Sequence, residues 1–458
     1  MSCEQLSEHD FTTIPDAPTV VESATPVDAK DLLPGYCRVR GYVKQRVQLE
    51  LRLPEEANWN GKLFMQGCRA YCGEIHIGKA NDALLKGYAT VATDMGHTGH
   101  ILDAKWAYNN RAGEIDYAFR ATHVVAVAAK AIISAWADTA PKRAFFRGCS
   151  TGGRQGLIEA ARFPHDFDGI VAGAPVAPKL GALNFYWTST ANIGMDGQQI
   201  LHPEHVRLIH GAALDQCDAI DGQADGVIDD PRNCRFEPSG LACKDTQKSS
   251  YCLSPVQVKA AERLYQAPVN SAGQPQAPGG HLPGGELNWL DVIVPQGEQS
   301  ALYLHLAEEN FRYLAFAEDP GPEYTIDQFN LDTDSERMNF MAHLSTGFLP
   351  DLRAFRDRGG KLILYHGWQD GPALNTVDFY DLAVQTMGGY TATRKFFRLF
   401  MVPGMNHCGG GPGPNTFDFI AAIEAWVEGD SPPNELLGTH GDESGTASYS
   451  RAVKAYPD

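Results

Sequence analysis

The pentapeptide Gly148-Cys149-Ser150-Thr151-Gly152 constrains the fold of this chain more than any other segment. It follows an apolar, β-prone run at 143–148 and precedes a helical pattern at 152–162. A G-x-S-x-G pattern between a strand and a helix is typical of a sharp turn that exposes a serine at the end of the strand. The pattern is weak alone, but in this context it predicts that Ser150 is a nucleophile.

Strand and helix patterns alternate around this turn and again near the end of the chain. The β-prone runs and helical patterns lie at 35–43, 47–53, 62–67, 88–94, 118–137, 361–370, 376–386, 396–404 and 417–428. Such alternation favours βαβ units. We predict the α/β class, with an α/β-hydrolase fold and a mostly parallel sheet.

The alternation disappears in the middle of the chain, between about residues 178 and 345. This stretch has four cysteines, many aromatic residues and a Pro/Gly-rich segment at 267–285. We predict that 178–345 is a large inserted lid domain, and that 1–177 and 346–458 form a discontinuous catalytic domain. Substrates of such folds bind at the carboxyl ends of the strands, which the lid is expected to cover.

A serine nucleophile needs a base, and the base needs a carboxylate that orients it. Asp370 follows one late strand pattern and His407 follows the next. The order Ser150, Asp370, His407 is that of the α/β-hydrolase arrangement. His366 is an alternative base, because it lies four residues before Asp370.

Other carboxylates stay open as partners of the base. Asp94, with His97 nearby, could orient it, and Asp351 and Asp357 also lie close to the late strands. Strand position alone favours Asp370 over these residues.

The ten cysteines are even in number, which favours an oxidising compartment over ten free thiols. Zinc is disfavoured because no matching pair of cysteines or histidine spacing is present. The order of the ten cysteines along the chain favours the pairs Cys3–Cys37, Cys68–Cys72, Cys217–Cys234, Cys243–Cys252 and Cys149–Cys408. The last pair flanks Ser150 and His407, and a disulfide there would hold its Cα atoms roughly 4.4–6.8 Å apart.

The start of the chain has no charged and apolar leader pattern, so we expect a secreted or periplasmic protein whose leader has been removed.

The chain is acidic, with a net charge of −18, and has no run of 18 or more apolar residues. The charge argues against nucleic acid or an anionic membrane as a partner, because phosphate groups require basic patches. We expect no membrane partner and no membrane-spanning helix. The oligomeric state is not set by these features.

An oxyanion hole requires backbone N–H groups aimed at the charge that develops on the substrate. One donor is expected to be Thr151, the residue after the predicted nucleophile. The second is expected in the loop after the strand at 62–67, where Cys68 and Gly67 are the two candidates.

At these residues the chain resembles the tannase and feruloyl esterase family, which also includes mono(2-hydroxyethyl) terephthalate hydrolases. The resemblance extends from Cys3 to about Pro457 and rests on the motifs at 148–153, 365–370 and 403–411. It implies Ser150 as nucleophile, Asp370 and His407 as partners, a Cys149–Cys408 disulfide, and a lid that binds an aromatic acyl group.

Two segments depart from the family. Cys68, Arg69 and Ala70 fill a loop that is often all glycine in the family, and we expect this to reshape the cleft. Lys454 stands where the family has a cysteine, so a C-terminal disulfide common in the family is absent.

An acidic loop between Cys217 and Cys234 suggests a calcium site. Counted from Asp221 it has acids at positions 1, 5 and 9, but Arg232 at position 12 excludes an EF-hand. The resemblance instead implies one structural Ca²⁺ held by the side chains of Asp218, Asp221 and Asp225 and the carbonyls of Gln223 and Val227. A solvated acidic turn without metal is the alternative.

Together these features predict a serine carboxylic ester hydrolase without an organic cofactor. A small aromatic ester of the hydroxycinnamoyl (feruloyl) type is the expected substrate, and a galloyl ester or a terephthalate half-ester is the alternative. A catalytically silent binding protein on the same scaffold and a peptidase of the same fold remain further alternatives.

Overall fold

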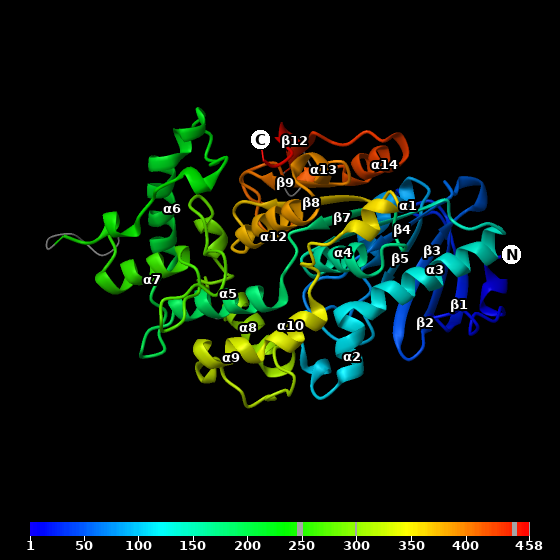
Figure 1. The fold of residues 1–458 in the computed structure, drawn as a ribbon, viewed down its shortest axis with the longest axis horizontal. Coiled ribbons are helices and arrows are strands. Elements are labelled where there is room, and N and C mark those ends of the chain that lie inside the picture. Colours follow the sequence, from blue (N-terminus) through cyan, green and yellow to red (C-terminus); the bar gives the residue numbers. More distant parts are fainter. Residues whose placement is uncertain (245–250, 298–299, 442–446, 458) are drawn as a thin grey trace.

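The computed structural model describes residues 1–244, 251–297, 300–441 and 447–457. One large twisted sheet forms its centre (Figure 1), with strand order β1-β2-β3-β5-β4-β6-β7-β8-β9. These strands are β1 (Thr19–Val27), β2 (Tyr36–Val43), β3 (Val47–Pro54), β4 (Lys62–Gln66), β5 (Ala89–Thr93), β6 (Arg143–Cys149), β7 (Gly169–Gly173), β8 (Lys361–Gly367) and β9 (Phe397–Val402).

Six strands of this sheet run parallel, from β5 through β4, β6, β7 and β8 to β9. β1, β2 and β3 extend it as an antiparallel edge. The predicted α/β fold with a mostly parallel sheet is therefore confirmed. Parallel strands present their carboxyl ends at one edge, so the residues that follow β4, β6, β8 and β9 lie near one another.

Helices cover both faces of the sheet. Outside the segment between β7 and β8 they are α1 (Asn81–Leu85), α2 (Arg111–Ile115), α3 (Ala121–Ala137), α4 (Thr151–Arg162), α11 (Arg353–Asp357), α12 (Ala373–Thr386), α13 (Tyr390–Thr393) and α14 (Phe419–Gly429). Strand alternation separates the two cores: Leu362 and Leu364 of β8 pack with α12, whereas Ile363 packs with α14.

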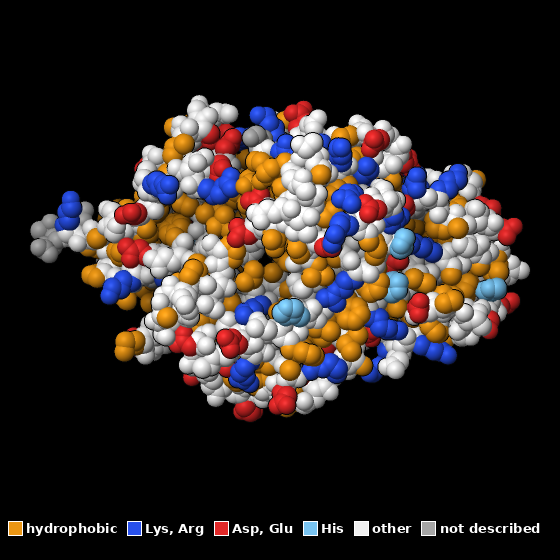
Figure 2. All heavy atoms as spheres, viewed as in Figure 1, with side chains coloured by type: hydrophobic (Ala, Val, Ile, Leu, Met, Phe, Trp, Pro, Cys, Tyr) orange, Lys and Arg blue, Asp and Glu red, His pale blue; other side chains and the backbone are white. Residues whose placement is uncertain are grey.

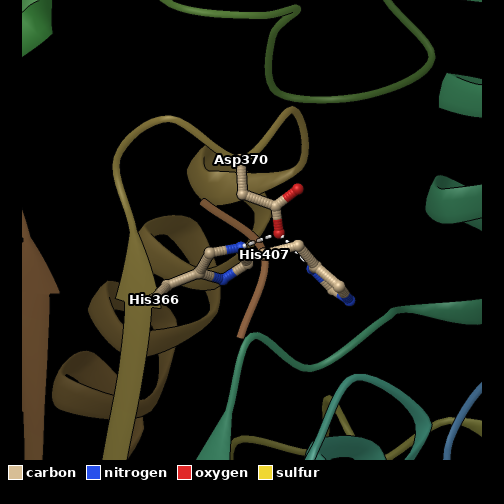
Figure 3. Close-up of side chains that lie close together, drawn as sticks. All are labelled: His366, Asp370 and His407. Carbon is tan, nitrogen blue, oxygen red and sulfur yellow. Dashed lines mark hydrogen bonds and ion pairs between the residues drawn. The ribbon is translucent and has the colours of Figure 1, made fainter. Parts of the chain in front are cut away.

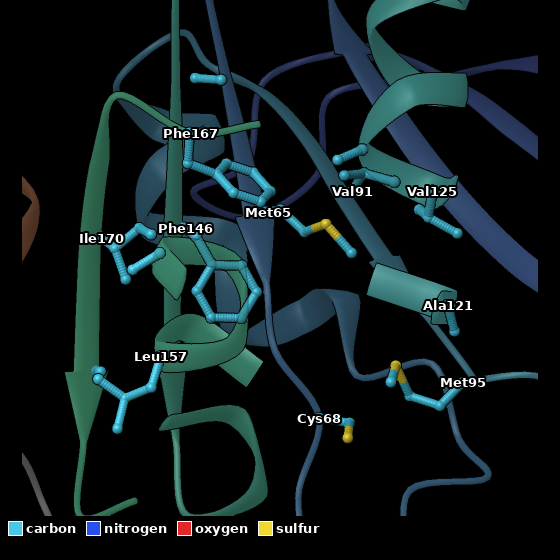
Figure 4. Packing of buried hydrophobic residues seen from close by; sticks show 14 of the residues in the cluster. Met65, Cys68, Val91, Met95, Ala121, Val125, Phe146, Leu157, Phe167 and Ile170 are labelled. Carbon is cyan, nitrogen blue, oxygen red and sulfur yellow. The ribbon is translucent and has the colours of Figure 1, made fainter. Parts of the chain in front are cut away.

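The core between the sheet and α3 and α4 is made of large apolar side chains (Figure 4). Phe146 of β6 packs with Leu157 of α4, and Val91 of β5 faces Val125 of α3. This burial fixes α4 against the sheet, and with it the turn that carries Ser150.

α2, a π-helical segment η5 (Asp116–Arg120) and α3 form one continuous helix, Arg111–Ala137. Contrary to the sequence expectation, this helix is long and apolar enough to cross a membrane, with a mean hydropathy of 1.3. However, Val124, Val125, Ile132 and Ile133 are buried in the core of the domain. The helix therefore packs as a core helix of this fold.

The segment between β7 and β8 is mainly helical and lies beyond the ends of the strands (Figure 1). Its helices are α5 (Pro178–Ala191), α6 (Pro203–Cys217), α7 (Pro255–Tyr265), α8 (Leu302–Tyr313), α9 (Leu331–Arg337) and α10 (Asn339–Ser345). They enclose two apolar clusters of their own, one around Trp289 and one around Phe311. A small antiparallel sheet of β10 (Thr416–Phe417), β11 (Glu435–Gly441) and β12 (Ala447–Lys454) follows near the C-terminus.

Candidate active site

Ser150 lies at a strained turn between β6 and α4. Its backbone has φ 63° and ψ −122°, a conformation that residues with a side chain rarely adopt. Its N–H donates to Gly173 O at 2.9 Å, which holds the turn to the end of β7. Such strain is typical of functional positions, and here it places the serine at the N-terminus of α4.

Two glycines of the motif are required by close contacts. A Cβ atom at Gly148 would lie 2.4 Å from Gly152 O, and one at Gly153 would lie 2.1 Å from Gly173 O. No side chain fits at either position. The glycines therefore allow α4 to begin directly against β6 and β7.

Asp370 and His407 follow β8 and β9 and form a close pair (Figure 3). His407 Nδ1 donates to Asp370 Oδ2 at 2.5 Å, because a carboxylate can only accept here. The hydrogen on Nδ1 leaves His407 Nε2 free to act as an acceptor. The Asp370 side chain is buried, whereas the His407 side chain is 36% exposed.

The charges of this pair stabilise each other. Burial alone would raise the pKa of Asp370, but the His407 charge and the hydrogen bonds from His366 and His407 outweigh it and hold this pKa well below its ordinary value. Burial lowers the pKa of His407, and the Asp370 carboxylate more than offsets this, so the pKa of His407 is raised. Asp370 is therefore an anion that orients and stabilises the imidazole.

The Cys149–Cys408 disulfide joins the residue before Ser150 to the residue after His407, with a Cα–Cα distance of 5.9 Å. It links β6 to the loop after β9 across 259 residues of sequence. The structure also contains the other four pairs that the cysteine order favoured, Cys3–Cys37, Cys68–Cys72, Cys217–Cys234 and Cys243–Cys252.

Ser150, Thr151, Asp370 and His407 all line one cavity of about 280 Å³. Among the described residues, Ser150 Oγ makes no hydrogen bond to His407, an arrangement common before a substrate binds. The inserted segment also lines this cavity, and its apolar members there include Phe185, Val292, Leu302, Tyr303 and Leu306. The arrangement can support attack by a serine on a carbonyl carbon held against an apolar surface.

The alternative base, His366, lies on the far side of Asp370 from the cavity. Its side chain is fully buried; Nε2 bonds Asp370 Oδ2 at 2.8 Å and Nδ1 bonds Thr376 Oγ1 at 2.7 Å. Both ring nitrogens are thus occupied, and His366 does not line the cavity. Its position suits support of the Asp370 carboxylate.

The alternative carboxylates lie elsewhere. Asp94 accepts N–H groups from Gln48 and Gly96 and does not line the cavity, while His97 stacks on Trp106. Asp351 and Asp357 form exposed ion pairs with neighbouring arginines. Asp370 is therefore the carboxylate that the structure brings to His407.

His366, Asp370 and His407 also bring their polar atoms within 4.8 Å of one another, as a metal site would require. Yet each imidazole directs a nitrogen at the same carboxylate oxygen, Oδ2. A metal bound there would have to replace both hydrogen bonds. The contacts therefore fit a hydrogen-bonded network better than a set of metal ligands.

Both candidates for the second oxyanion donor make hydrogen bonds within the protein. The N–H of Cys68 donates to Gln155 Oε1 at 3.1 Å, and that of Gly67 donates to Arg147 O at 2.8 Å. Both candidates are therefore occupied. The next residue, Arg69, lines the cavity, and its N–H has no partner among the described residues. Thr151 Oγ1 donates to Ala70 O at 2.6 Å and thereby ties this loop to the start of α4.

The acidic loop is closed by the Cys217–Cys234 disulfide. In this structure its carboxylates do not converge; Asp218 accepts the N–H of Gly226, and Asp221 accepts those of Gln223 and Asp229. The carbonyls of Gln223 and Val227 accept no hydrogen bond within the described residues. Carboxylate and carbonyl oxygens of this kind are the ligands that Ca²⁺ prefers, so the donor set fits the ion.

Comparison with known proteins places these features in context. The family model described as tannase and feruloyl esterase matches residues 34–458. Mono(2-hydroxyethyl) terephthalate hydrolase of Piscinibacter sakaiensis is 33% identical, over 100% of this chain and 88% of that protein. Probable feruloyl esterase B-2 of Aspergillus flavus is 32% identical, over 88% of this chain and 80% of that protein. The structure of feruloyl esterase B from Aspergillus oryzae superposes with a TM-score of 0.86 at 26% identity, over 100% and 96% of the two chains.

Proposed function

Because the chain belongs to the tannase and feruloyl esterase family and is a carboxylic ester hydrolase, we propose that it cleaves small aromatic esters through an acyl-enzyme on Ser150. The main support is the convergence of Ser150 and the Asp370-bound His407 on one cavity. This geometry provides a nucleophile, a base and an orienting carboxylate.

In the proposed reaction, Ser150 Oγ attacks the ester carbonyl while His407 Nε2 takes the serine proton. The N–H groups of Thr151 and Arg69 then stabilise the oxyanion. His407 gives the proton to the leaving alcohol, and a water molecule activated by the same histidine releases the acid. Asp370 remains ionised throughout and stabilises the imidazolium.

The inserted segment 178–345 is proposed to act as the lid domain that holds the acyl group. Leu302 and Leu306 of α8 and Phe185 of α5 line the same cavity as Ser150. Tyr71 OH donates to Leu306 O at 2.7 Å and ties α8 to the loop after β4. A hydroxycinnamoyl ester is the first proposed substrate, and galloyl and terephthalate half-esters are the alternatives.

Labelling with a fluorophosphonate probe tests the nucleophile. We expect the probe to modify Ser150, and Ser150→Ala to lose the label and about 10⁴-fold or more of kcat. Ser239→Ala, at an exposed serine outside the cavity, is the matched control and should keep both. Labelling that persists in Ser150→Ala, or esterase activity that survives in it, would refute the proposal. To distinguish an esterase from a peptidase of the same fold, p-nitroanilides can be compared with p-nitrophenyl esters. The anilides should be cleaved far more slowly.

We also propose that the acidic loop binds one structural Ca²⁺. The side chains of Asp218, Asp221 and Asp225 would hold it together with the carbonyls of Gln223 and Val227. The loop also contacts the catalytic domain, since the Arg232 guanidinium lies 4.9 Å from the Trp368 ring. Calcium should therefore raise Tm and a chelator should lower it. An equal Tm with Ca²⁺ and with chelator would identify the loop as an acidic turn without metal.

Five disulfides support a further proposal, that the protein works outside a reducing cytosol, either secreted or in the periplasm. Localisation of the tagged protein by cell fractionation tests this directly. Recovery in the cytosol with free thiols would contradict it.

A further inference from the structure

Arg69 is the one exposed residue in the lining of the cavity that contains Ser150. All the other lining residues are buried or partly buried, and Leu314 and Met341 are among the buried ones. The His407 side chain is 36% exposed. Arg69 and His407 therefore lie at the mouth of the cavity, whereas the buried residues form its inner end.

The two carboxylates of the lining already have partners within the protein. Glu114 Oε2 lies 2.6 Å from Arg111 Nη1 and forms an ion pair with it. Asp370 accepts hydrogen bonds from His366 and His407. Neither carboxylate pairs with an arginine that lines the cavity.

Two arginines line the cavity, and they differ in what holds them. Arg154 is buried; it donates to Ser345 O at 3.1 Å and to Tyr117 O at 3.3 Å, and its guanidinium lies 4.6 Å from the Tyr117 ring. The Arg69 side chain makes no hydrogen bond, ion pair or cation–π contact among the described residues. The N–H groups of its guanidinium are therefore available to a ligand at the mouth.

The loop that carries Arg69 is held on both sides of this residue. Cys68 N–H donates to Gln155 Oε1 at 3.1 Å, and Ala70 O accepts a hydrogen bond from Thr151 Oγ1 at 2.6 Å. Both contacts are made by α4, which begins at the nucleophile. Binding of a ligand to the guanidinium then has to order only the side chain, which limits the entropic cost.

The proposed reaction places the leaving alcohol beside Arg69. His407 gives its proton to the alcohol oxygen, so this oxygen must lie against His407 at the mouth. Burial and the charge of Arg69 lower the pKa of His407, and Asp370 raises it by more, so Arg69 is an electrostatic neighbour of the imidazole. The acyl group is then expected at the inner end, along Leu314 and Met341.

Resting on the proposed ester hydrolysis, we infer that Arg69 binds a carboxylate in the alcohol part of the ester. A planar guanidinium matches a carboxylate with parallel hydrogen bonds. The favoured substrates are therefore esters of an aromatic acid with a hydroxy acid, which is released as the alcohol. The inserted segment would hold the acyl group, and Arg69 would select the alcohol. A carboxylate on the acyl ring lies at the other end of the cavity and gains nothing from Arg69.

Two pairs of esters test this inference. In the alcohol pair, cinnamate is esterified with 3-hydroxypropanoate or with 3-hydroxypropanamide. In the acyl pair, methyl cinnamate carries a 4-carboxyl or a 4-carbamoyl group. For the alcohol pair, the ratio of kcat/KM for the carboxylate to that for the amide should fall about 5-fold from the wild type to Arg69→Gln at low salt, the factor for an exposed ion pair. High salt should reduce the wild-type ratio, because ions screen the charges.

Arg69→Lys keeps the charge but not the planar group, and should keep part of the ratio. Each kcat/KM is measured on the pH plateau of its variant, so that a shifted pKa of His407 does not enter. Arg207→Gln, at an exposed arginine outside the cavity, is the matched control and should leave the ratio unchanged. A wild-type ratio in Arg69→Gln would overturn the inference while the proposed hydrolysis stood. A fall in the acyl pair alone would also overturn it, because Arg69 would then contact the acyl group.

Binding gives a second measurement that does not depend on turnover. In calorimetry, the Ser150→Ala protein should bind the 3-hydroxypropanoate ester about 5-fold more tightly than the amide, and addition of Arg69→Gln should remove this difference. Equal affinities at low salt would overturn the inference. A clear preference in binding, with no ester hydrolysed by the wild type, would instead support the anion site and refute the proposed function.

Discussion

The two walls of the cavity are built on different principles. The wall from the sheet holds Ser150, Thr151 and His407 in the segments that follow the parallel strands β6 and β9, fixed by backbone hydrogen bonds and by the Cys149–Cys408 disulfide. The wall from the inserted segment consists mainly of side chains on helices α5 and α8, with Val292 and Met341 beside them. The sheet wall therefore suits chemistry, which needs fixed geometry, and the helical wall suits selection among substrates.

The largest effect is expected when the sheet wall loses its orienting charge. Asp370→Asn should lower kcat by about 10⁴-fold, because an amide no longer fixes the productive tautomer of His407 or stabilises its charged form. The loss should be the same for an aromatic ester and for p-nitrophenyl acetate. Asp351→Asn, at an exposed ion pair, is the control. A loss below 10-fold would mean that another carboxylate orients the base.

Removal of the Cys149–Cys408 disulfide from the sheet wall should lower both the stability of the protein and its activity. The Cys149→Ala, Cys408→Ala double variant releases a link across 259 residues, which should cost about 2–5 kcal/mol of the free energy of unfolding. kcat should also fall, since Ser150 and His407 are no longer tied. The Cys243→Ala, Cys252→Ala variant removes a disulfide that closes only 9 residues, and should lower Tm less. Unchanged kcat and Tm in the first variant would show that the Cys149–Cys408 disulfide contributes to neither activity nor stability.

A change in the helical wall should alter selection rather than chemistry. Leu302→Ala removes apolar surface from the cavity and should lower kcat/KM for an aromatic ester by about 10-fold. Hydrolysis of an acetyl ester, which does not reach this wall, should fall much less. Leu382→Ala, at a leucine that is 49% exposed on α12, provides the control. An equal loss of kcat/KM for the aromatic and the acetyl ester would contradict the assignment of substrate selection to the helical wall.

The same division explains what could be predicted from the sequence. Ser150, Asp370 and His407 each follow a recognisable strand pattern, and parallel strands bring their ends together. The predicted sheet was confirmed for this reason. The sequence could not rank the candidates for the second oxyanion donor, because the N–H of Cys68 donates to Gln155, a residue of α4 that no local pattern connects to the loop.

The sequence contains no comparable pattern that predicts which residues form the wall from the inserted segment. Leu302 and Phe185 line the cavity only because α5 and α8 pack together across more than one hundred residues of sequence. Glu114 was missed for a similar reason. Glu114 lies three residues after Arg111 on a helix and has the pattern of a solvated ion pair, yet its side chain is only 2% exposed and lines the cavity.

Surface charge is a poor guide to the site as well. Acidic and basic side chains are interspersed over the face shown in Figure 2, whereas the charge that matters to His407 is local. The Arg69 side chain is exposed, lines the cavity, and has no acidic partner among the described residues. Substitution of Arg69 therefore tests how a nearby charge in the sheet wall affects His407.

Arg69→Gln should produce the smallest effect, a shift of the pH profile. Burial and the charge of Arg69 lower the pKa of His407, and Asp370 raises it by more. Removal of the arginine charge should therefore raise this pKa further. Since His407 must be neutral to take the serine proton, the acid limb of kcat/KM should move to higher pH.

Arg69→Lys keeps the charge and should leave the acid limb in place. Salt should reduce the difference between Arg69→Gln and the wild type, because ions screen exposed charges. The backbone N–H of residue 69 is unchanged in both variants, so kcat on the pH plateau should change little. An acid limb that stays in place at low salt would show that the base is isolated from the loop after β4. The electrostatics of the sheet wall would then be set by Asp370 and His366 alone.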